Sequence, residues 1–154
     1  MTTTIAKTIL TITPMIDKMR KSILESNKTL ARKSINRDTY ETAQKILDNI
    51  ECCDELYNLK VLVMCWYDDL PDKSQSIIKL FYLKRQTIER IVFLLRIARS
   101  SLYKLIDELT KDFANYLEKT SIDYFNFKRL LKRNDWIRKE YQMQLAELDT
   151  SIDN

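Results

Sequence analysis

The sequence predicts an all-α protein, and three observations lead to this prediction. The chain has 154 residues, no glycine and two prolines. Without glycine it lacks the residue that tight hairpins and phosphate-binding loops require, which argues against an all-β fold and against P-loop or dinucleotide sites. Apolar residues instead recur at helical spacing in several segments. A chain of this length can form one domain with a core, or a smaller domain with helical extensions.

Residues 1–69 are expected to form an N-terminal helical region that begins with a basic helix. Thr13 as N-cap and Pro14 at the first helical position predict a helix that runs to about Ser34. The stretch from Thr8 to Ile16 is the only one that looks like a signal sequence, and it is short, threonine-rich and interrupted by Pro14. The predicted helix carries six basic residues: Lys18, Arg20, Lys21, Lys28, Arg32 and Lys33.

An acidic helix is expected to follow. Asn36 to Thr39 interrupts the first helix, and Asp38 with Glu41 forms a capping pair for a second helix that extends to about Tyr67. From Asp38 to Asp72 the chain has nine acidic and two basic residues, a net charge of −7. The apolar run from Val61 to Tyr67 also fits a buried strand, but the long helical lead-in favours a buried helix end. Four residues share one side of this helix: Ile46, Ile50, Cys53 and Tyr57.

Residues 70–120 contain two short apolar stripes that predict a helix-turn-helix unit. Only the segment from Arg96 to Ser101 separates the stripes, so two helices that share a core must be joined by a turn. The first stripe consists of Ile88, Ile91, Val92 and Leu95. The second consists of Leu102, Leu105, Ile106 and Leu109.

This unit is also the most basic part of the chain. Seven basic residues and one acid, Glu89, lie between Lys79 and Lys104, a net charge of +6 in a chain whose total is +4. Lysine and arginine provide the attraction and the counterion release that drive nucleic-acid binding, so this segment is a candidate phosphate-contacting surface. The alternative is a solvated helical face. The seven are Lys79, Lys84, Arg85, Arg90, Arg96, Arg99 and Lys104.

The residues of this segment resemble a known family. Leu70-Pro71, Phe81-Tyr82-Leu83, Thr87-Ile88-Glu89-Arg90-Ile91 and the run from Ile97 to Leu102 resemble, without gaps, the region 4 helix-turn-helix of sigma-70-type factors. The run from Arg99 to Leu105 is closer still to the ArpU/RinA-type regulators of late transcription in phages of low-GC Gram-positive bacteria. The resemblance implies a sigma region 4-like helix-turn-helix, here flanked by long N-terminal and C-terminal helices, in a regulator of phage or prophage origin.

The chain departs from the family pattern in three ways, at four positions. Arg85 and Arg96 stand where the family usually has glycine, and a left-handed backbone at Arg96, in the turn, costs a non-glycine residue about 1–2 kcal/mol. Ala98 replaces the serine that caps the recognition helix, which loses about 1 kcal/mol unless Ser100 or Ser101 substitutes. Val92 replaces a small residue where the helices cross, so the helices are expected to stand slightly further apart.

Double-stranded DNA is therefore the expected partner. We expect Arg99, Ser100, Tyr103 and Lys104 to bind the DNA. Tyr103 lies opposite the buried stripe of its helix and has no core to fill, so a contact with a base or with the sugar-phosphate backbone is favoured there. Ordinary surface exposure of Tyr103 is the alternative. The full set of expected DNA contacts is Lys84, Arg85, Thr87, Arg90, Arg96, Arg99, Ser100, Ser101, Tyr103 and Lys104.

Residues 121–154 are expected to form a C-terminal basic and amphipathic helix that starts at about Tyr124, after a break from Asn115 to Ser121. Beside Trp136 lies a basic stripe that has three interpretations: a second phosphate contact, a contact for the acidic helix of the same or another copy, or a solvated face. A homodimer through the acidic and last helices, with a palindromic DNA site, is expected from their complementary charges. The basic stripe consists of Lys128, Arg129, Lys132 and Arg133; the apolar side consists of Leu130, Ile137, Tyr141, Leu145, Leu148 and Ile152.

The composition disfavours most enzymatic functions. The absence of histidine excludes Ser-His-Asp and Cys-His nucleophiles and histidine metal ligands. The three cysteines, Cys52, Cys53 and Cys65, lack a fourth ligand and are expected to be buried, reduced thiols. Their odd number and the absence of a secretory signal predict a cytoplasmic protein of a bacterial host cell, and no segment is long enough to span a membrane.

One acidic cluster could still hold Mg²⁺ in a nuclease. Asp68, Asp69 and Asp72 flank Pro71 at a helix start, where carboxylates instead satisfy free N–H groups, and this interpretation is favoured. We therefore expect no catalytic residues, no metal and no cofactor.

The sequence thus predicts a non-enzymatic, sequence-specific DNA-binding transcriptional regulator. The alternative is an adaptor that binds RNA polymerase or another protein through the sigma-like unit without reading DNA sequence. A regulator needs the outward face of the second helix to be accessible, whereas an adaptor tolerates its burial.

Overall fold

The computed structural model describes residues 2–33, 39–120 and 124–152, and this part of the chain is helical without any strand. The all-α prediction is confirmed. The elements are α1 (Thr2–Ile12), the 3₁₀ turn η1 (Thr13–Met15), α2 (Ile16–Lys33), α3 (Thr39–Asp68), α4 (Asp72–Ile78), the π-helical turn η3 (Lys79–Leu83), α5 (Ile88–Leu95), α6 (Arg99–Lys119), α7 (Tyr124–Arg133) and α8 (Asp135–Ile152). No helix in these ranges is long and apolar enough to cross a membrane.

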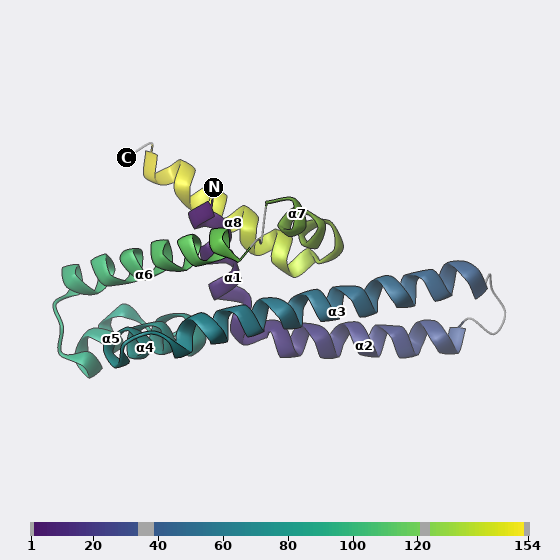
Figure 1. Ribbon diagram of the computed structural model, residues 1–154, viewed down its shortest axis with the longest axis horizontal. Helices are drawn as coiled ribbons and strands as arrows, with labels where there is room; N and C mark the ends of the chain where they lie inside the picture. Colours follow the sequence, from purple (N-terminus) through teal and green to yellow (C-terminus); the bar gives the residue numbers. More distant parts are fainter. Residues whose placement is uncertain (1, 34–38, 121–123, 153–154) are drawn as a thin grey trace.

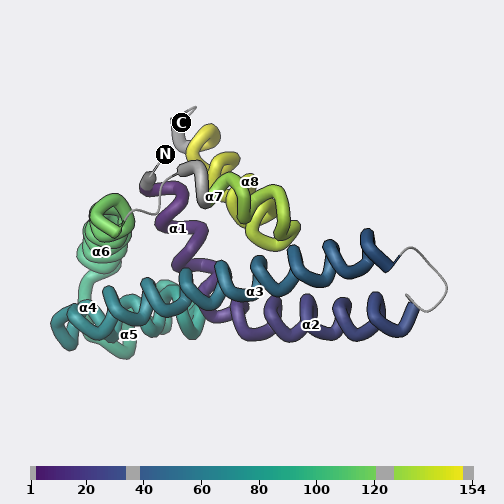
Figure 2. Tube along the Cα trace, turned by 45° about the vertical axis from the view of Figure 1, so that its right-hand side comes forward, coloured from purple at the N-terminus to yellow at the C-terminus, as the bar shows by residue number. Residues whose placement is uncertain are grey.

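Helix α1 was not predicted, and it lies at the centre of the molecule. Ile9, Leu10 and Ile12 are fully buried, and α1 packs between α6 and α8 (Figure 2). Two buried threonine hydroxyls are satisfied within the helix, since Thr8 Oγ1 donates to the Thr4 carbonyl at 2.8 Å and Thr13 Oγ1 to the Ile9 carbonyl at 2.6 Å. Buried threonines tolerate an apolar environment when they bond to the preceding turn in this way.

The expected start of the basic helix was therefore wrong. Thr13 does not act as an N-cap, because its hydroxyl bonds backwards to α1 and the chain is already helical before it. Pro14 lies in the η1 turn, where its missing N–H is tolerated, and α2 continues to Lys33. Ser34 and the expected interruption at 36–38, with the capping residue Asp38, lie outside the described residues.

Helices α2 and α3 form a long antiparallel hairpin (Figure 1). Asn49 donates to the Asn27 side chain at 2.7 Å, Asn27 Nδ2 donates to the Ile46 carbonyl at 3.4 Å, and Lys60 pairs with Asp17 at 2.8 Å. The expected acidic helix is thus confirmed as α3, and Val61 to Tyr67 is helical. Ile50 and Tyr57 of the predicted side are exposed, and the Arg20 guanidinium of α2 lies over the Tyr57 ring, 4.9 Å from its centre. The buried face of α3 consists of Cys52, Cys53, Leu56, Leu59, Val63 and Trp66.

The predicted helix-turn-helix segment folds as two helices joined by a turn. Helix α5 spans the first stripe, and α6 starts at Arg99 after a turn of three residues. Helix α6 extends to Lys119, past the expected break at Asn115, because Phe113, Ala114 and Leu117 continue its buried stripe.

The single C-terminal helix that we expected is interrupted at Asn134. The Asn134 side-chain oxygen accepts bonds from the backbone N–H groups of Trp136 (3.0 Å) and Ile137 (3.2 Å). It is therefore the N-cap of a new helix, α8, because an N-cap side chain satisfies the free N–H groups of the first turn. Ser121, the expected end of the break before this helix, lies outside the described residues.

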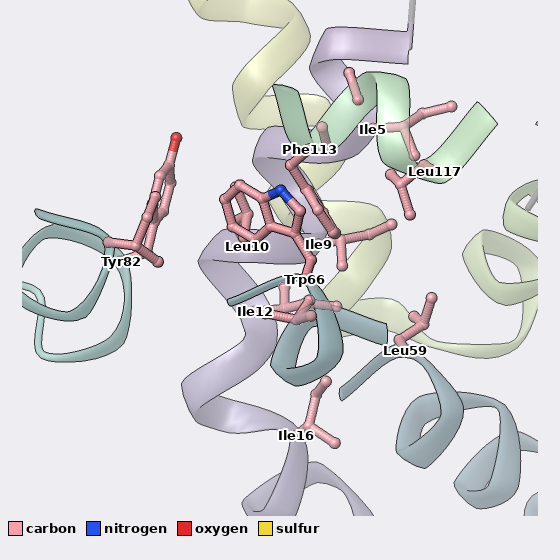
Figure 3. Packing of buried hydrophobic residues seen from close by; sticks show 14 of the residues in the cluster. Ile5, Ile9, Leu10, Ile12, Ile16, Leu59, Trp66, Tyr82, Phe113 and Leu117 are labelled. Carbon is pink, nitrogen blue, oxygen red and sulfur yellow. The ribbon is translucent and has the colours of Figure 1, made fainter. Parts of the chain in front are cut away.

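One hydrophobic cluster joins all these parts. Trp66 of α3 packs on Phe113 of α6 with ring centroids 4.8 Å apart, and Trp66 Nε1 donates to Asp112 Oδ2 at 2.9 Å (Figure 3). The Tyr82 and Thr110 hydroxyls bond to each other at 2.8 Å in the same region. The helix-turn-helix unit is thereby fixed to α1 and to the base of the hairpin.

Candidate nucleic-acid interface

All ten residues expected to contact DNA are exposed. They lie in the segment before α5, on α5, in the turn and on the first turns of α6. This end of the molecule lies opposite the hairpin tip (Figure 1). The expected DNA contacts Ser100 and Lys104 share one row of α6, and Arg99 and Tyr103 share the adjacent row, because residues four apart are neighbours on a helix.

Two arginines of this surface have a left-handed backbone. Arg85 has φ 50° and Arg96 has φ 53° and ψ 47°, at the two positions where the resembled family has glycine. The left-handed backbone expected at Arg96 is confirmed. Each position costs a non-glycine residue about 1–2 kcal/mol.

The helix starts differ in how they are capped. The Thr87 hydroxyl accepts the Arg90 N–H at 3.3 Å and caps α5. Ala98 stands at the N-cap of α6 and supplies no side-chain bond, so the expected loss of a cap at this position is confirmed. Val92 is partly buried against the core.

Arg85 also has a role within the fold. Its Nη2 donates to the Thr11 carbonyl of α1 at 3.0 Å, although the side chain is exposed. This carbonyl is close to the end of α1, where the helix dipole favours a cation. Arg85 therefore ties the segment before α5 to the central helix, a contact between residues too distant in the chain for the sequence to predict.

Arg99 is positioned by two neighbours. Glu89 of α5 lies 3.4 Å from the Arg99 guanidinium, which is 5.9 Å from the centre of the Tyr103 ring. The interaction with Tyr103, followed by that with Glu89, raises the pKa of Arg99. Like any arginine, it is charged at physiological pH. A permanently charged planar group with a stacked aromatic neighbour suits recognition of a guanine edge or a phosphate.

Tyr103 is half-exposed and lines a hollow behind the start of α6. The hollow has a volume of about 420 Å³ and lies between α1, η3, α6 and α8. Tyr82 contributes to its wall, and burial raises the pKa of this tyrosine. The outward position expected for Tyr103 is thus present, but one side of the ring faces this hollow.

An exposed apolar pair on α5 was not singled out from the sequence. Phe93 and Leu94 are 78% and 46% exposed. The signal was the run Ile91–Leu95, which holds more consecutive apolar residues than one face of a short helix can bury.

The basic stripe of the C-terminal region contacts the acidic helix of the same chain. Arg133 lies 3.3 Å from Glu51 and 3.4 Å from Glu55, and Arg129 lies 3.8 Å from Glu55. Arg129 and Arg133 therefore contact the acidic helix of the same chain, which is one of the three interpretations given for the basic stripe. Lys128 and Lys132 are exposed.

The cysteines and the acidic cluster show no metal site. Within the described ranges no group of three or more potential ligands is assembled, and Asp72 lies in the first turn of α4. Cys52 and Cys53 are buried, and burial raises the pKa of both thiols. The expected burial of Cys65 was wrong: it is exposed, because it faces away from the side of α3 that buries Val63 and Trp66.

Comparisons with family models, with curated proteins and with solved structures found no match to this chain.

Proposed function

We propose that this protein is a sequence-specific DNA-binding transcriptional regulator of phage or prophage origin that acts in the cytoplasm of a bacterial host. The single observation that supports it best is the exposed basic surface formed by α5, the turn and the start of α6. The segment from Lys79 to Lys104 has a net charge of +6, and its basic side chains are exposed. Such a surface attracts a polyanion such as DNA.

In this proposal α6 enters the major groove with its N-terminal turns. Residues at the start of a recognition helix are the ones that meet base edges in helix-turn-helix proteins. Arg99 and Lys104 provide donors for guanine, Ser100 provides a hydroxyl, and Tyr103 provides an apolar ring for a thymine methyl group or a sugar. Lys84, Thr87, Arg90 and Arg96 hold the phosphate backbone, with Ser101 beside them, and Arg85 anchors the unit to α1.

The first test is binding of the full chain to duplex DNA from a random library and from the flanking genome, followed by selection of the preferred sequence. We expect the logarithm of the binding constant to fall linearly with the logarithm of the salt concentration, by about 0.9 per phosphate contact. Folded protein that binds no duplex at low salt would contradict the proposal.

The alternative function is an adaptor that binds RNA polymerase or another protein through the same unit. The exposed pair Phe93 and Leu94 favours it, because exposed large apolar side chains next to each other are typical of protein interfaces. Pull-down of purified polymerase with wild type and with Phe93→Ser tests it: binding lost in the variant, together with an absence of sequence preference on DNA, would favour the adaptor.

A further inference from the structure

The hairpin has an apolar groove between its two helices. Four apolar side chains line it: Leu24, Ala31, Ile46 and Ile50. Leu24 and Ile50 are 45% and 42% exposed, so a substantial apolar surface meets solvent there. Asn27 and five charged residues complete the lining: the cations Arg20, Lys21 and Lys28 and the acids Asp17 and Glu25.

The lining of the groove carries a net positive charge, because its three cations outnumber its two acids. Helix α2 carries six basic and two acidic residues in the range Ile16–Lys33. One of the acids, Asp17, is paired with Lys60 of α3, which leaves Glu25 as the only α2 carboxylate without a described ion pair. An apolar segment with acidic neighbours is the complementary partner for such a groove.

The second half of helix α8 combines exposed apolar side chains with acidic neighbours. Its apolar stripe begins with the buried Ile137 and Tyr141 and continues with Leu145 and Leu148, which are 38% and 42% exposed. The stripe is therefore longer than the core that covers it. After Lys139 the chain has no lysine or arginine, and its charged side chains are Glu140, Glu147, Asp149 and Asp153.

The two surfaces cannot meet within one chain. The groove lies along the hairpin, whereas the end of α8 lies near the N-terminal end of α1, far from the hairpin tip, in both views (Figures 1 and 2). The contact that does close within the chain uses Arg129 and Arg133 of α7 with the acidic α3. Two of the four cations first expected to join two copies, Arg129 and Arg133, are thus already paired within the chain, which turns attention to the basic α2 and the acidic end of α8.

We propose that the second half of α8 of one copy docks in the α2–α3 groove of a second copy, and that the exchange is reciprocal. A two-fold pairing of this kind buries both apolar surfaces and brings Lys21 and Lys28 near Asp149 of the other copy. A second copy supplies both complementary surfaces at once, which favours it over a different protein. The proposal does not depend on DNA binding.

Light scattering or sedimentation over a concentration series tests it. The wild-type mass should rise from 18.4 kDa toward twice that value as concentration increases. Leu24→Asp in the groove and Leu148→Asp on α8 should each raise the concentration of half-association by about tenfold or more, since loss of a central apolar contact costs 1.4 kcal/mol or more and each 1.4 kcal/mol is a factor of ten. Leu47→Asp, on the same hairpin but outside the groove lining, is the matched control and should leave the association unchanged.

Two combinations distinguish this contact from any other dimer. A mixture of Leu24→Asp and Leu148→Asp should associate better than either variant alone, because one intact groove then meets one intact α8. Lys28→Glu and Asp149→Lys should each weaken the dimer, and the double variant should recover much of the loss. A mass that stays at 18.4 kDa up to high micromolar concentration, or a dimer that neither Leu24→Asp nor Leu148→Asp weakens, would overturn the proposal.

Discussion

The carboxylate of Glu89 lies 3.4 Å from the guanidinium of Arg99, and this ion pair links α5 to the first turn of α6. Glu89 is the only acid between Lys79 and Lys104, and it sits against an arginine that the proposed function assigns to base recognition. If the proposed function holds, DNA competes with Glu89 for Arg99, and the carboxylate repels nearby phosphates.

Glu89→Gln should accordingly strengthen DNA binding. We expect tighter binding at low salt and a smaller gain at high salt, because salt screens the interaction of exposed charges. Binding titrations at two salt concentrations measure this. Glu118→Gln, an exposed acid near the far end of α6, carries the same charge change and should have a much smaller effect. Equal gains in both variants would show that only net charge matters.

Arg96→Gly should stabilise the fold and weaken DNA binding. Glycine adopts the left-handed backbone of the turn without the clash that costs arginine about 1–2 kcal/mol, so the urea midpoint should rise. Loss of one phosphate contact should reduce the salt slope by about 0.9. Arg85→Gly, the other left-handed position, should gain less stability because it also loses the bond to the Thr11 carbonyl. A lower midpoint for Arg96→Gly would contradict this account.

The two helix caps should respond in opposite directions. Ala98→Ser gives α6 the missing cap and should stabilise the protein by about 1 kcal/mol, whereas Thr87→Ala removes the cap of α5 and should cost about 1 kcal/mol. Denaturant unfolding of the two variants measures both changes. An Ala98→Ser variant no more stable than wild type would mean that the backbone N–H groups in the first turn of α6 already have other hydrogen-bond partners.

Arg133→Ala should destabilise the protein without affecting DNA binding. Arg133 bridges Glu51 and Glu55, and its loss should cost about 1 kcal/mol, the upper end for a partly exposed pair. Lys132→Ala, at the exposed neighbouring position, should change stability little. If Arg133→Ala weakens DNA binding and leaves stability unchanged, the basic stripe contacts phosphate after all.

The sequence predicted the local features of the helix-turn-helix segment well. Helix α5 matches the predicted stripe, and the left-handed Arg96 and the uncapped Ala98 followed from the resembled family pattern. These features depend on residues that are close in the chain, so spacing and turn chemistry suffice to find them.

Helix α1 could not be predicted in this way. Its threonines and isoleucines have weak helix propensity, and the helix is stabilised by burial between α6 and α8, which are distant in sequence. The interruption at Asn134 did have a local signal, since asparagine followed by an acidic residue is a typical helix start. The contacts of Arg85 with Thr11 and of Arg133 with Glu51 join residues 74 and 82 positions apart, so only the three-dimensional structure reveals which basic side chains are already engaged.

The most direct test of the proposed function compares two DNAs with three alanine variants. Affinities are measured for the preferred duplex obtained by selection and for a scrambled duplex of the same length and composition. Tyr103→Ala and Lys104→Ala should lower the ratio of the two affinities by about tenfold, because base contacts contribute about 1–3 kcal/mol of discrimination. Lys84→Ala should weaken both complexes alike and leave the ratio unchanged. Equal losses on both duplexes in all three variants would contradict the claim that α6 reads the DNA sequence.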